Sequence, residues 1–270
     1  MNIYYQGNPG SYMHSASIFI ESNLNQKIDH IEGKPDFKEV WENIGQEWIG
    51  VLALENSYMW SIHPNLYGFL SHDFKIIWEY YMPINHCICS KETDIKNIKK
   101  AYSQMPALEQ CHNYLKEKKI QSMNYSDTAL SAKLASETEE RGIAGICSEL
   151  AASIYNLNIL EKEIQDQKEN TTRFAIIVPR KSSLSYNLKS SKTTILFEAH
   201  DVSASLYKCL WAFAKNDINL TKIESMPSFR WSFLKLFWID AEGTTNDLDM
   251  QKALEELKSL TKELRILWEY

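Results

Sequence analysis

Short, continuous apolar runs are the feature that most constrains the fold of this chain. Residues 48–54 (WIGVLAL), 142–147 (GIAGIC) and 172–178 (TRFAIIV) contain few polar side chains. Runs of this length are short for a buried helix and are typical of strands that are covered on both faces. They alternate with segments of helical pattern, which favours an α/β fold with largely parallel sheets.

Other strands and helices are expected around these runs. Ser11 can cap a helix that follows the turn at residues 7–10. Further strands are expected at 1–5, 75–80 and 85–89, and helices at 11–21, 37–44, 106–116, 128–136 and 148–155.

The pattern changes after residue 178. Residues 179–191 are polar and rich in serine, so we interpret them as a linker. Beyond the linker we expect strands at 193–199, 218–225, 231–240 and 264–268, with helices at 204–216 and 248–260. The resulting order, βαββαβ, is the ferredoxin-like motif.

Composition excludes several classes of protein. A length of 270 residues corresponds to about two domains. A net charge of −6, with 44% hydrophobic and 24% charged residues, excludes a disordered chain and argues against a general nucleic-acid-binding protein. We expect no membrane-spanning segment and no signal peptide, because apolar runs stay far below ~20 residues and the N-terminus has no basic start.

The five cysteines do not form the pattern of a zinc site. Cys87 and Cys89 are the one close pair in the sequence, and no second pair or suitably spaced histidines complete a ligand set. We therefore expect reduced thiols, no metal site and a cytoplasmic protein.

Four segments carry groups suited to ligand binding. Residues 7–11 (GNPGS) lie between a strand and a helix, where free backbone N–H groups favour an anion. Residues 55–57 (ENS) follow a buried strand, at the end where α/β sheets bind ligands. Gln110 lies in an amphipathic helix, and Thr172 and Arg173 open a buried strand. Each segment also has a plain structural alternative: a turn, a loop-capping cluster, core packing, or a buried hydrogen bond beside a surface charge.

Together, the order and spacing of these segments resemble the prephenate dehydratase family along nearly the full chain. The first matches are YQGNPGSY at 5–12 to YQGxxGxYS, LENS at 54–57 to IENS, and SQMPALEQC at 103–111 to SHPQALxQC. DTALSAK at 127–133 resembles DTAxSAK, and residues 143–157 resemble AAIAS…AA…YGL. IQDQKENTTRF at 164–174 resembles the signature IxD…NxTRF, and INLTKIESMP at 218–227 resembles INLTKIESRP of the family's C-terminal ACT domain.

The resemblance implies a fold and an activity. It implies two α/β subdomains with a cleft, similar to periplasmic binding proteins, in a catalytic domain at 1–178, then the linker and a ferredoxin-like ACT regulatory domain at 192–270. Members of the family convert prephenate to phenylpyruvate, with loss of water and carbon dioxide, in phenylalanine synthesis, and they use no cofactor. The resemblance also implies a homodimer or homotetramer with L-phenylalanine as a possible allosteric effector.

The resemblance further assigns candidate site residues. Thr172 matches the threonine that is usually held essential for activity in this family. We expect it to hydrogen-bond the leaving hydroxyl or relay a proton. Glu55 is a candidate acid, and Asn56 completes the catalytic group. The substrate-binding candidates are Ser57, Ser103, Gln110, Thr128, Arg173, Gly10 and Ser11. If the strand is regular, an inward Thr172 points Arg173 outward.

Several positions depart from the family's pattern. Trp60 stands where the family has a glycine, which adds volume beside the pocket and disfavours a positive φ. Tyr67 replaces an aspartate, Met13 a serine, and Gln104 and Met105 the histidine and proline of SHPQ. We expect these positions, Trp60 most of all, to influence efficiency or substrate choice.

The ACT segment also departs from the pattern. Its regulatory candidates are Ala204, Ser205, Leu206, Glu224, Ser225, Met226 and Pro227. Ala204 replaces a loop glycine and Met226 an arginine, so feedback inhibition is expected to be weakened, absent or retuned. The structural alternative is a dimerisation module without a ligand.

Two other functions stay open at this point. One is a non-catalytic amino-acid sensor, which the substitutions at Trp60, Met13 and Met226 suggest. The other is an enzyme that decarboxylates prephenate and keeps its hydroxyl. Relatives with that chemistry tend to lack the threonine of TRF, so Thr172 argues against it.

Overall fold

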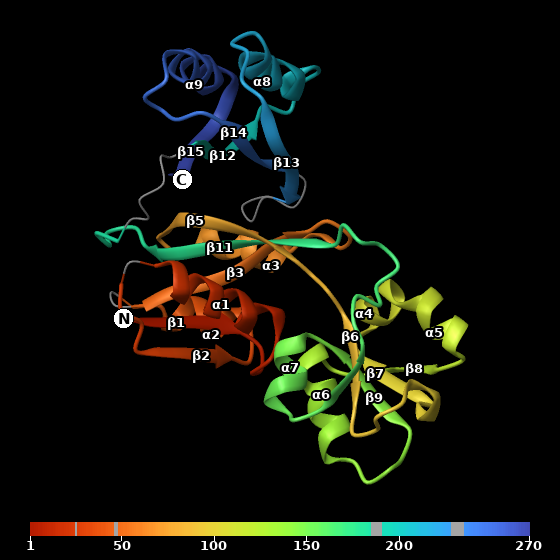
Figure 1. Cartoon of the computed structure of the whole chain (residues 1–270). Helices are drawn as coiled ribbons and strands as arrows, with labels where there is room; N and C mark the ends of the chain where they lie inside the picture. The colour runs from red at the N-terminus through yellow and green to blue at the C-terminus, as the bar shows by residue number, and fades with distance from the viewer. Residues whose placement is uncertain (25, 46–47, 185–190, 228–234) are drawn as a thin grey trace. The chain divides into compact units, whose positions relative to one another are not determined.

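The structure is a computed structural model that describes all residues except 25, 46–47, 185–190 and 228–234. The chain divides into two compact units. The first comprises residues 1–74 and 79–182, and the second comprises residues 75–78 and 183–270. Figure 1 shows the elements of each unit.

The first sheet has the strand order β2-β1-β3-β11-β5, with β4 paired to β3. Its strands are β1 (Asn2–Gln6), β2 (His30–Lys34), β3 (Trp48–Asn56), β4 (Trp60–Ser61), β5 (Phe74–Pro83) and β11 (Thr171–Pro179). The helices α1 (Tyr12–Asn23), α2 (Phe37–Asn43) and α3 (His63–Ser71) belong to this part of the chain. The apolar run of β3 is almost fully buried, as expected for a strand covered on both faces.

The second sheet has the order β10-β6-β9-β7-β8. Its strands are β6 (Cys87–Ser90), β7 (Lys100–Ser103), β8 (Gln121–Asn124), β9 (Ile143–Cys147) and β10 (Asn158–Glu161). The helical segments are η1 (Ile95–Asn97), α4 (Met105–Gln110), α5 (His112–Lys118), α6 (Thr128–Glu137) and α7 (Glu149–Ile154). The chain passes from the first sheet into this one after β5 and returns with β11, so the first unit contains two α/β subdomains (Figure 1).

The second unit is a four-stranded sheet of order β13-β14-β12-β15 with two helices on one side (Figure 1). Its elements are β12 (Lys192–Ala199), α8 (Ser205–Ala214), β13 (Leu220–Pro227), β14 (Lys235–Glu242), α9 (Leu248–Leu260) and β15 (Thr261–Glu269). Ile195 and Ile239 of the sheet pack with Phe213 of α8 and Leu257 of α9. This is the expected βαββαβ order, and the predicted fold class is confirmed.

The structure corrects the prediction of largely parallel sheets. β1 runs parallel to β2 and β3, and β7 runs parallel to β8 and β9. However, β11 is antiparallel to β3, and β6 is antiparallel to both β9 and β10. These antiparallel strands stand at the two crossings between subdomains, where the chain changes sheet instead of continuing a βαβ repeat.

Several elements differ from the predicted ones. β2, α3, β7, β8 and β10 were not expected, because their short segments lack a clear apolar period. The single helix expected at 106–116 is two helices separated at Cys111. Part of the expected linker, 185–190, and residues 231–234 of an expected strand lie outside the described residues. Among the described residues, no helix is both long and apolar enough to cross a membrane.

Candidate active site

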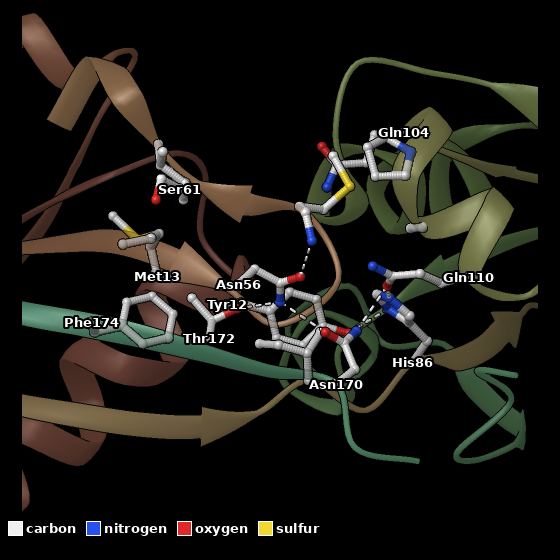
Figure 2. A pocket seen from close by; sticks show the side chains of 16 residues that line it. Tyr12, Met13, Asn56, Ser61, His86, Gln104, Gln110, Asn170, Thr172 and Phe174 are labelled. Atoms are coloured by element: carbon white, nitrogen blue, oxygen red, sulfur yellow. Dashed lines mark hydrogen bonds between the residues drawn. The ribbon is translucent and has the colours of Figure 1, made fainter. Parts of the chain in front are cut away.

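A cavity of about 420 Å³ lies in the first unit, and both subdomains contribute to its wall. α1, β3, β4 and β11 supply residues from the first sheet's side, and the segment before β6 and α4 supply residues from the other. Its polar side chains include Tyr12, Asn56, His86, Gln110, Asn170 and Thr172 (Figure 2). The rest of the wall is largely apolar, with Ala53, Ile62, Ile84, Pro106 and Phe174 among its residues.

Strand pairing brings two of the predicted catalytic residues together. β11 pairs with β3 so that Thr172 lies opposite Asn56 and Arg173 lies opposite Glu55. Because successive side chains of a strand point to opposite faces, Asn56 and Thr172 reach the cavity from the same side. The Asn56 amide donates a hydrogen bond to the Thr172 hydroxyl oxygen at 2.9 Å.

A chain of hydrogen bonds extends from this pair across the cavity wall (Figure 2). Asn56 Nδ2 donates to Asn170 Oδ1 at 2.8 Å, and Asn170 Nδ2 donates to Gln110 Oε1 at 2.9 Å. His86 Nε2 lies 2.8 Å from the same Gln110 oxygen, and Tyr12 Oη lies 2.7 Å from His86 Nδ1. The chain therefore links α1, β3, β11 and α4 around one cavity.

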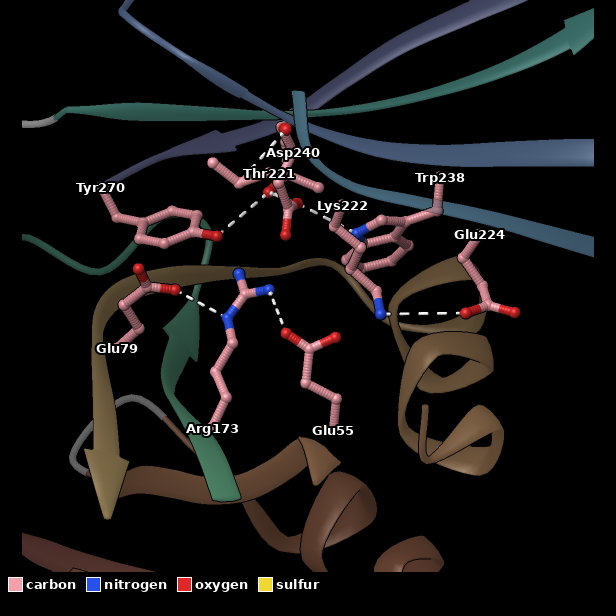
Figure 3. Close-up of polar contacts among 10 residues, drawn as sticks. Glu55, Glu79, Arg173, Thr221, Lys222, Glu224, Trp238, Asp240 and Tyr270 are labelled. Atoms are coloured by element: carbon pink, nitrogen blue, oxygen red, sulfur yellow. Dashed lines mark hydrogen bonds and ion pairs between the residues drawn. The ribbon is translucent and has the colours of Figure 1, made fainter. Parts of the chain in front are cut away.

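Glu55 and Arg173 lie on the other face of this sheet from Thr172. Arg173 donates to Glu55 at 3.1 Å and to Glu79 at 2.7 Å, and its side chain is only 2% exposed (Figure 3). Neither Glu55 nor Arg173 lines the cavity. The structure therefore does not bring the candidate acid or the candidate carboxylate partner to Thr172.

Ser57 and Ser103 hydrogen-bond to backbone groups and do not line the cavity. The Ser57 hydroxyl donates to the Glu169 carbonyl and accepts from the Thr171 N–H, which ties the end of β3 to β11. Ser103 is fully buried in β7 and donates to the Ile146 carbonyl at 2.8 Å. Gln110 is the one predicted substrate-binding residue that lines the cavity, among those that the structure describes.

Gly10, Ser11 and Thr128 belong to a neighbouring cluster. Ser11 caps α1 by accepting from the His14 N–H, and Thr128 opens α6 directly after its capping residue. Asn8 Nδ2 donates to that capping residue, Asp127, at 2.9 Å, which joins the loop at 7–11 to α6. These residues shape the boundary between subdomains and do not line the cavity.

Three residues of this hydrogen-bond chain, Tyr12, His86 and Asn170, were not among the site residues predicted from the sequence. Tyr12 and Asn170 lie inside the motifs YQGNPGSY and IQDQKENTTRF, so their positions were available as a signal. His86 had no such signal, because its side-chain partners come from α1 and α4.

Burial shifts the pKa values of His86 and Tyr12, the last two groups of this hydrogen-bond chain. It lowers the pKa of the His86 imidazole below its ordinary value of 6.5, and the hydrogen bond with Gln110 opposes this shift. It raises the pKa of the Tyr12 phenol well above 10.0, so this phenol stays protonated near neutral pH. Among the described residues, no group of three or more His, Cys, Asp or Glu could hold a metal ion.

Trp60 does not obstruct the cavity. It is absent from the wall, and it is 82% exposed. Its φ is 66°, a left-handed backbone conformation that disfavours a β-carbon. The other departures are closer to the site, because Met13 and Gln104 both line the cavity.

The regulatory candidates lie at two places in the second unit. Ala204 caps α8 with a φ of 62°, so this alanine takes the left-handed conformation of a loop glycine. The hydroxyl of Ser205 beside it is buried and has no hydrogen-bond partner among the described residues. Glu224, Ser225, Met226 and Pro227 form the end of β13.

Two comparisons of sequence give the same family. The family model described as prephenate dehydratase matches residues 3–182. A bifunctional chorismate mutase/prephenate dehydratase of Aquifex aeolicus is 39% identical over 82% of this chain, a match that spans 60% of that relative. An arogenate dehydratase/prephenate dehydratase of Arabidopsis thaliana is 34% identical over 99% of this chain and 71% of its own length.

Solved structures share the fold over the whole chain. A prephenate dehydratase of Arthrobacter aurescens in complex with L-Phe has a TM-score of 0.87 at 24% identity, covering 100% of this chain and 89% of that one. GqqA, described as a quorum-quenching acylase, has a TM-score of 0.86 at 25% identity, covering 100% and 97%. With the family model spanning both subdomains and the cavity between their elements, the chain belongs to the prephenate dehydratase family.

Proposed function

We propose that this chain is a prephenate dehydratase, which converts prephenate to phenylpyruvate, water and carbon dioxide. The observation that carries this proposal is the Thr172 hydroxyl, which Asn56 holds at the wall of a largely apolar cavity. Family membership supports the same activity. Glu55 has no part in the proposed mechanism, because it lies on the opposite face of the sheet from Thr172.

Two donor groups face the substrate in this proposal. Because Thr172 Oγ1 accepts from Asn56, its own proton remains for a hydrogen bond to the leaving hydroxyl. Gln110 uses its oxygen to accept from His86 and Asn170, so its NH₂ group remains for a carboxylate or keto oxygen of the substrate.

The apolar wall favours the decarboxylation. The ring carboxylate loses its charge when its C–C bond breaks and carbon dioxide departs, so surroundings such as Ile84 and Phe174 disfavour the charged ground state. The electron pair of that bond enters the ring and expels the hydroxyl, which leaves as water after gaining one proton. Aromatisation of the ring supplies much of the driving force.

Turnover of prephenate by Thr172 variants tests the proposal. Thr172→Val keeps the shape and removes the donor, so we expect kcat to fall by about 10²–10³-fold, as for loss of one positioned donor. Thr172→Ser should retain substantial activity, and Thr171→Val is the matched control on the adjacent residue. Formation of phenylpyruvate is the readout.

The same assay separates the alternatives. Folded wild-type protein that binds prephenate without turnover would point to a sensor and overturn the proposal. Release of carbon dioxide without loss of the hydroxyl would point to the decarboxylase chemistry. Arogenate should be assayed in parallel, because the Arabidopsis relative is named for both substrates.

We also propose that the second unit is an ACT regulatory domain that binds L-phenylalanine. The βαββαβ order supports this assignment, as does the Ser205 hydroxyl at the start of α8, which is buried and has no partner in the described part of the chain. In this proposal residues 204–206 and 224–227 form the effector site, and the chain assembles as a homodimer or homotetramer. In this proposal the catalytic domain spans residues 1–178 and the regulatory domain spans residues 192–270.

Regulation is tested by adding L-phenylalanine to the prephenate assay and by sedimentation. We expect L-phenylalanine, and not D-phenylalanine, to lower the rate and raise the melting temperature. No response of either quantity would leave the second unit as an assembly module without this ligand.

We further propose a cytoplasmic location. The five cysteines are all buried and free, as is usual in a reducing compartment. Fractionation of the native cells is the direct test.

A further inference from the structure

The cavity wall offers no permanent positive charge, among the described residues, to match the dianionic substrate proposed above. Prephenate carries two carboxylates, yet the described residues that line the cavity include no Lys or Arg. Arg173 is committed to Glu55 and Glu79 on the other face of the sheet. Among the lining residues that the structure describes, His86 is the one side chain that can become positive.

The hydrogen-bond chain fixes which atom of each amide faces which neighbour. Asn56 Oδ1 accepts from the backbone N–H groups of Tyr58 and Met59, at 2.9 and 3.0 Å. Its Nδ2 therefore points to Asn170 Oδ1, which in turn points Asn170 Nδ2 to the oxygen of Gln110. Because Gln110 Oε1 can only accept, His86 Nε2 must carry a proton.

The other nitrogen of His86, Nδ1, lies beside the Tyr12 hydroxyl, which has a second possible acceptor for its one proton. Tyr12 Oη lies 2.7 Å from His86 Nδ1 and 2.8 Å from the Asn85 carbonyl oxygen. In neutral imidazole Nδ1 would need the single Tyr12 proton, which leaves none for Asn85. In imidazolium, Nδ1 donates to Tyr12 Oη and Tyr12 donates to Asn85. The charged form therefore satisfies every one of these contacts.

We propose that His86 takes up a proton when the dianionic substrate binds, and that the resulting imidazolium balances the substrate's charge through Gln110. The inference rests on the proposed function. His86 is a positioning residue here, because both of its nitrogens contact protein groups and Gln110 presents its NH₂ group to the substrate. The proton comes from solvent on binding.

The surroundings of His86 favour a neutral imidazole in the empty cavity and an imidazolium when the substrate is bound. Burial lowers the pKa of His86, which favours neutral imidazole while the cavity is empty. A substrate dianion favours the charged form and opposes that effect. The Tyr12 phenol stays protonated. The backbone N–H of Asp166 donates to the Gln110 carbonyl, and the Asp166 carboxylate accepts from the Asn113 N–H at 3.1 Å.

The thiols of Cys111 and Cys147 do not supply a competing negative charge. Burial raises the pKa of Cys111, and hydrogen bonding to other thiols together with burial raises the pKa of Cys147, so both stay protonated near neutral pH. The described titratable groups around the Tyr12–His86 pair are Cys87 and Cys89 of β6, Cys111 between α4 and α5, Cys147 of β9, and Asp166 before β11.

Calorimetry of prephenate binding tests the proton uptake. The full chain with Thr172→Val should convert prephenate about 10²–10³-fold more slowly than wild type, which leaves time to measure binding before product accumulates. Titrations at pH 7.5 in buffers of different ionisation enthalpy then report the protons taken up per ligand. We expect an uptake approaching one proton, reduced to about zero when His86→Gln is added. His112→Gln, an exposed histidine of α5, is the matched control and should leave the uptake unchanged.

The outcomes separate this inference from the proposed function. Binding without proton uptake, or uptake that persists with His86→Gln, overturns the role of His86 and leaves the dehydratase intact. If the Thr172→Val chain does not bind prephenate and wild type does not convert it, the proposed function fails instead.

A second measurement needs no change at His86. NMR titration of the His86 ring in the Thr172→Val chain should show its pKa rise when prephenate is present. An unchanged pKa in the prephenate complex would contradict the proposal even if the His86→Gln variant does not fold.

Discussion

At the scale of single residues, neighbours in sequence have different surroundings because a strand alternates its faces. Thr172 and Asn56 reach the cavity, whereas Arg173 and Glu55, one position away on each strand, form an ion pair on the other side. The motif TRF therefore contains two roles that residue type alone would not separate. The threonine faces the cavity, and the arginine is buried against two carboxylates.

Trp60 offers a residue-scale prediction about backbone strain. It follows a tight turn in which Asn56 Oδ1 binds the N–H groups of Tyr58 and Met59, and its φ of 66° is one that glycine adopts freely. Trp60→Gly should be more stable than Trp60→Ala by about 1 kcal/mol, because only glycine avoids the cost of the left-handed conformation.

Urea denaturation of the two Trp60 variants measures this difference. Trp60→Ala is the matched control, since both variants remove the exposed ring and only one keeps a β-carbon. Equal unfolding midpoints would contradict the strain argument. Because Trp60 is absent from the cavity wall, turnover of prephenate should change little in either variant.

At the scale of elements, the loop before α1 lies in close contact with α7 of the other subdomain. Gly10 has a φ of +91°, and a β-carbon there would lie 2.7 Å from the Ala151 Cα of α7. The Ser148 hydroxyl, which caps α7, also donates to the Gly10 carbonyl at 2.6 Å. The glycine of this motif thus allows α7 to pack closely against the loop, and the anion binding that its sequence suggested stays a prediction.

Gly10→Ala should therefore destabilise the chain by on the order of 2 kcal/mol, since it adds both backbone strain and a steric overlap. The free energy of unfolding in urea is the measurement. Gly45→Ala is the control, because a β-carbon there meets no described atom closer than 3.8 Å. A Gly10→Ala variant as stable as the control would show that α7 moves aside at little cost.

The sequence predicted helix boundaries well where a capping side chain is present and poorly where none is. Ser11 caps α1 as expected, and Asp127 caps α6 by accepting from the Leu130 N–H at 2.6 Å. By contrast, the break at Cys111 has no glycine or proline to mark it. That break places Gln110 at the end of α4, where its side chain joins the cavity.

At the scale of the whole molecule, His86 links folding stability to pH. Its pKa is lower in the folded chain than its ordinary value of 6.5, so the unfolded chain binds the proton more tightly. The stability from keeping His86 neutral is therefore present above about pH 6.5 and is lost as the pH falls below it. Burial lowers the pKa of His14 as well, which adds a second loss with the same sign.

Urea midpoints of the ligand-free chain at pH 8 and pH 5.5 check this linkage. The wild type should lose more stability between the two values than His86→Gln, by up to about 1.4 kcal/mol for each pH unit over which His86 titrates. His112→Gln should behave like the wild type. An equal loss in wild type and His86→Gln would contradict the assignment.

The sequence by itself determined the buried strands, the capped helices and the family, because these depend on local periodicity and on motifs that are contiguous in the chain. Only the tertiary structure decided which side chains meet. The contacts of Asn56 with Asn170 and Thr172 join residues more than a hundred positions apart, and they depend on the register of β11 against β3. Likewise, His86 gains its partners only because α1 and α4 pack at the same cavity, so no local pattern could mark it.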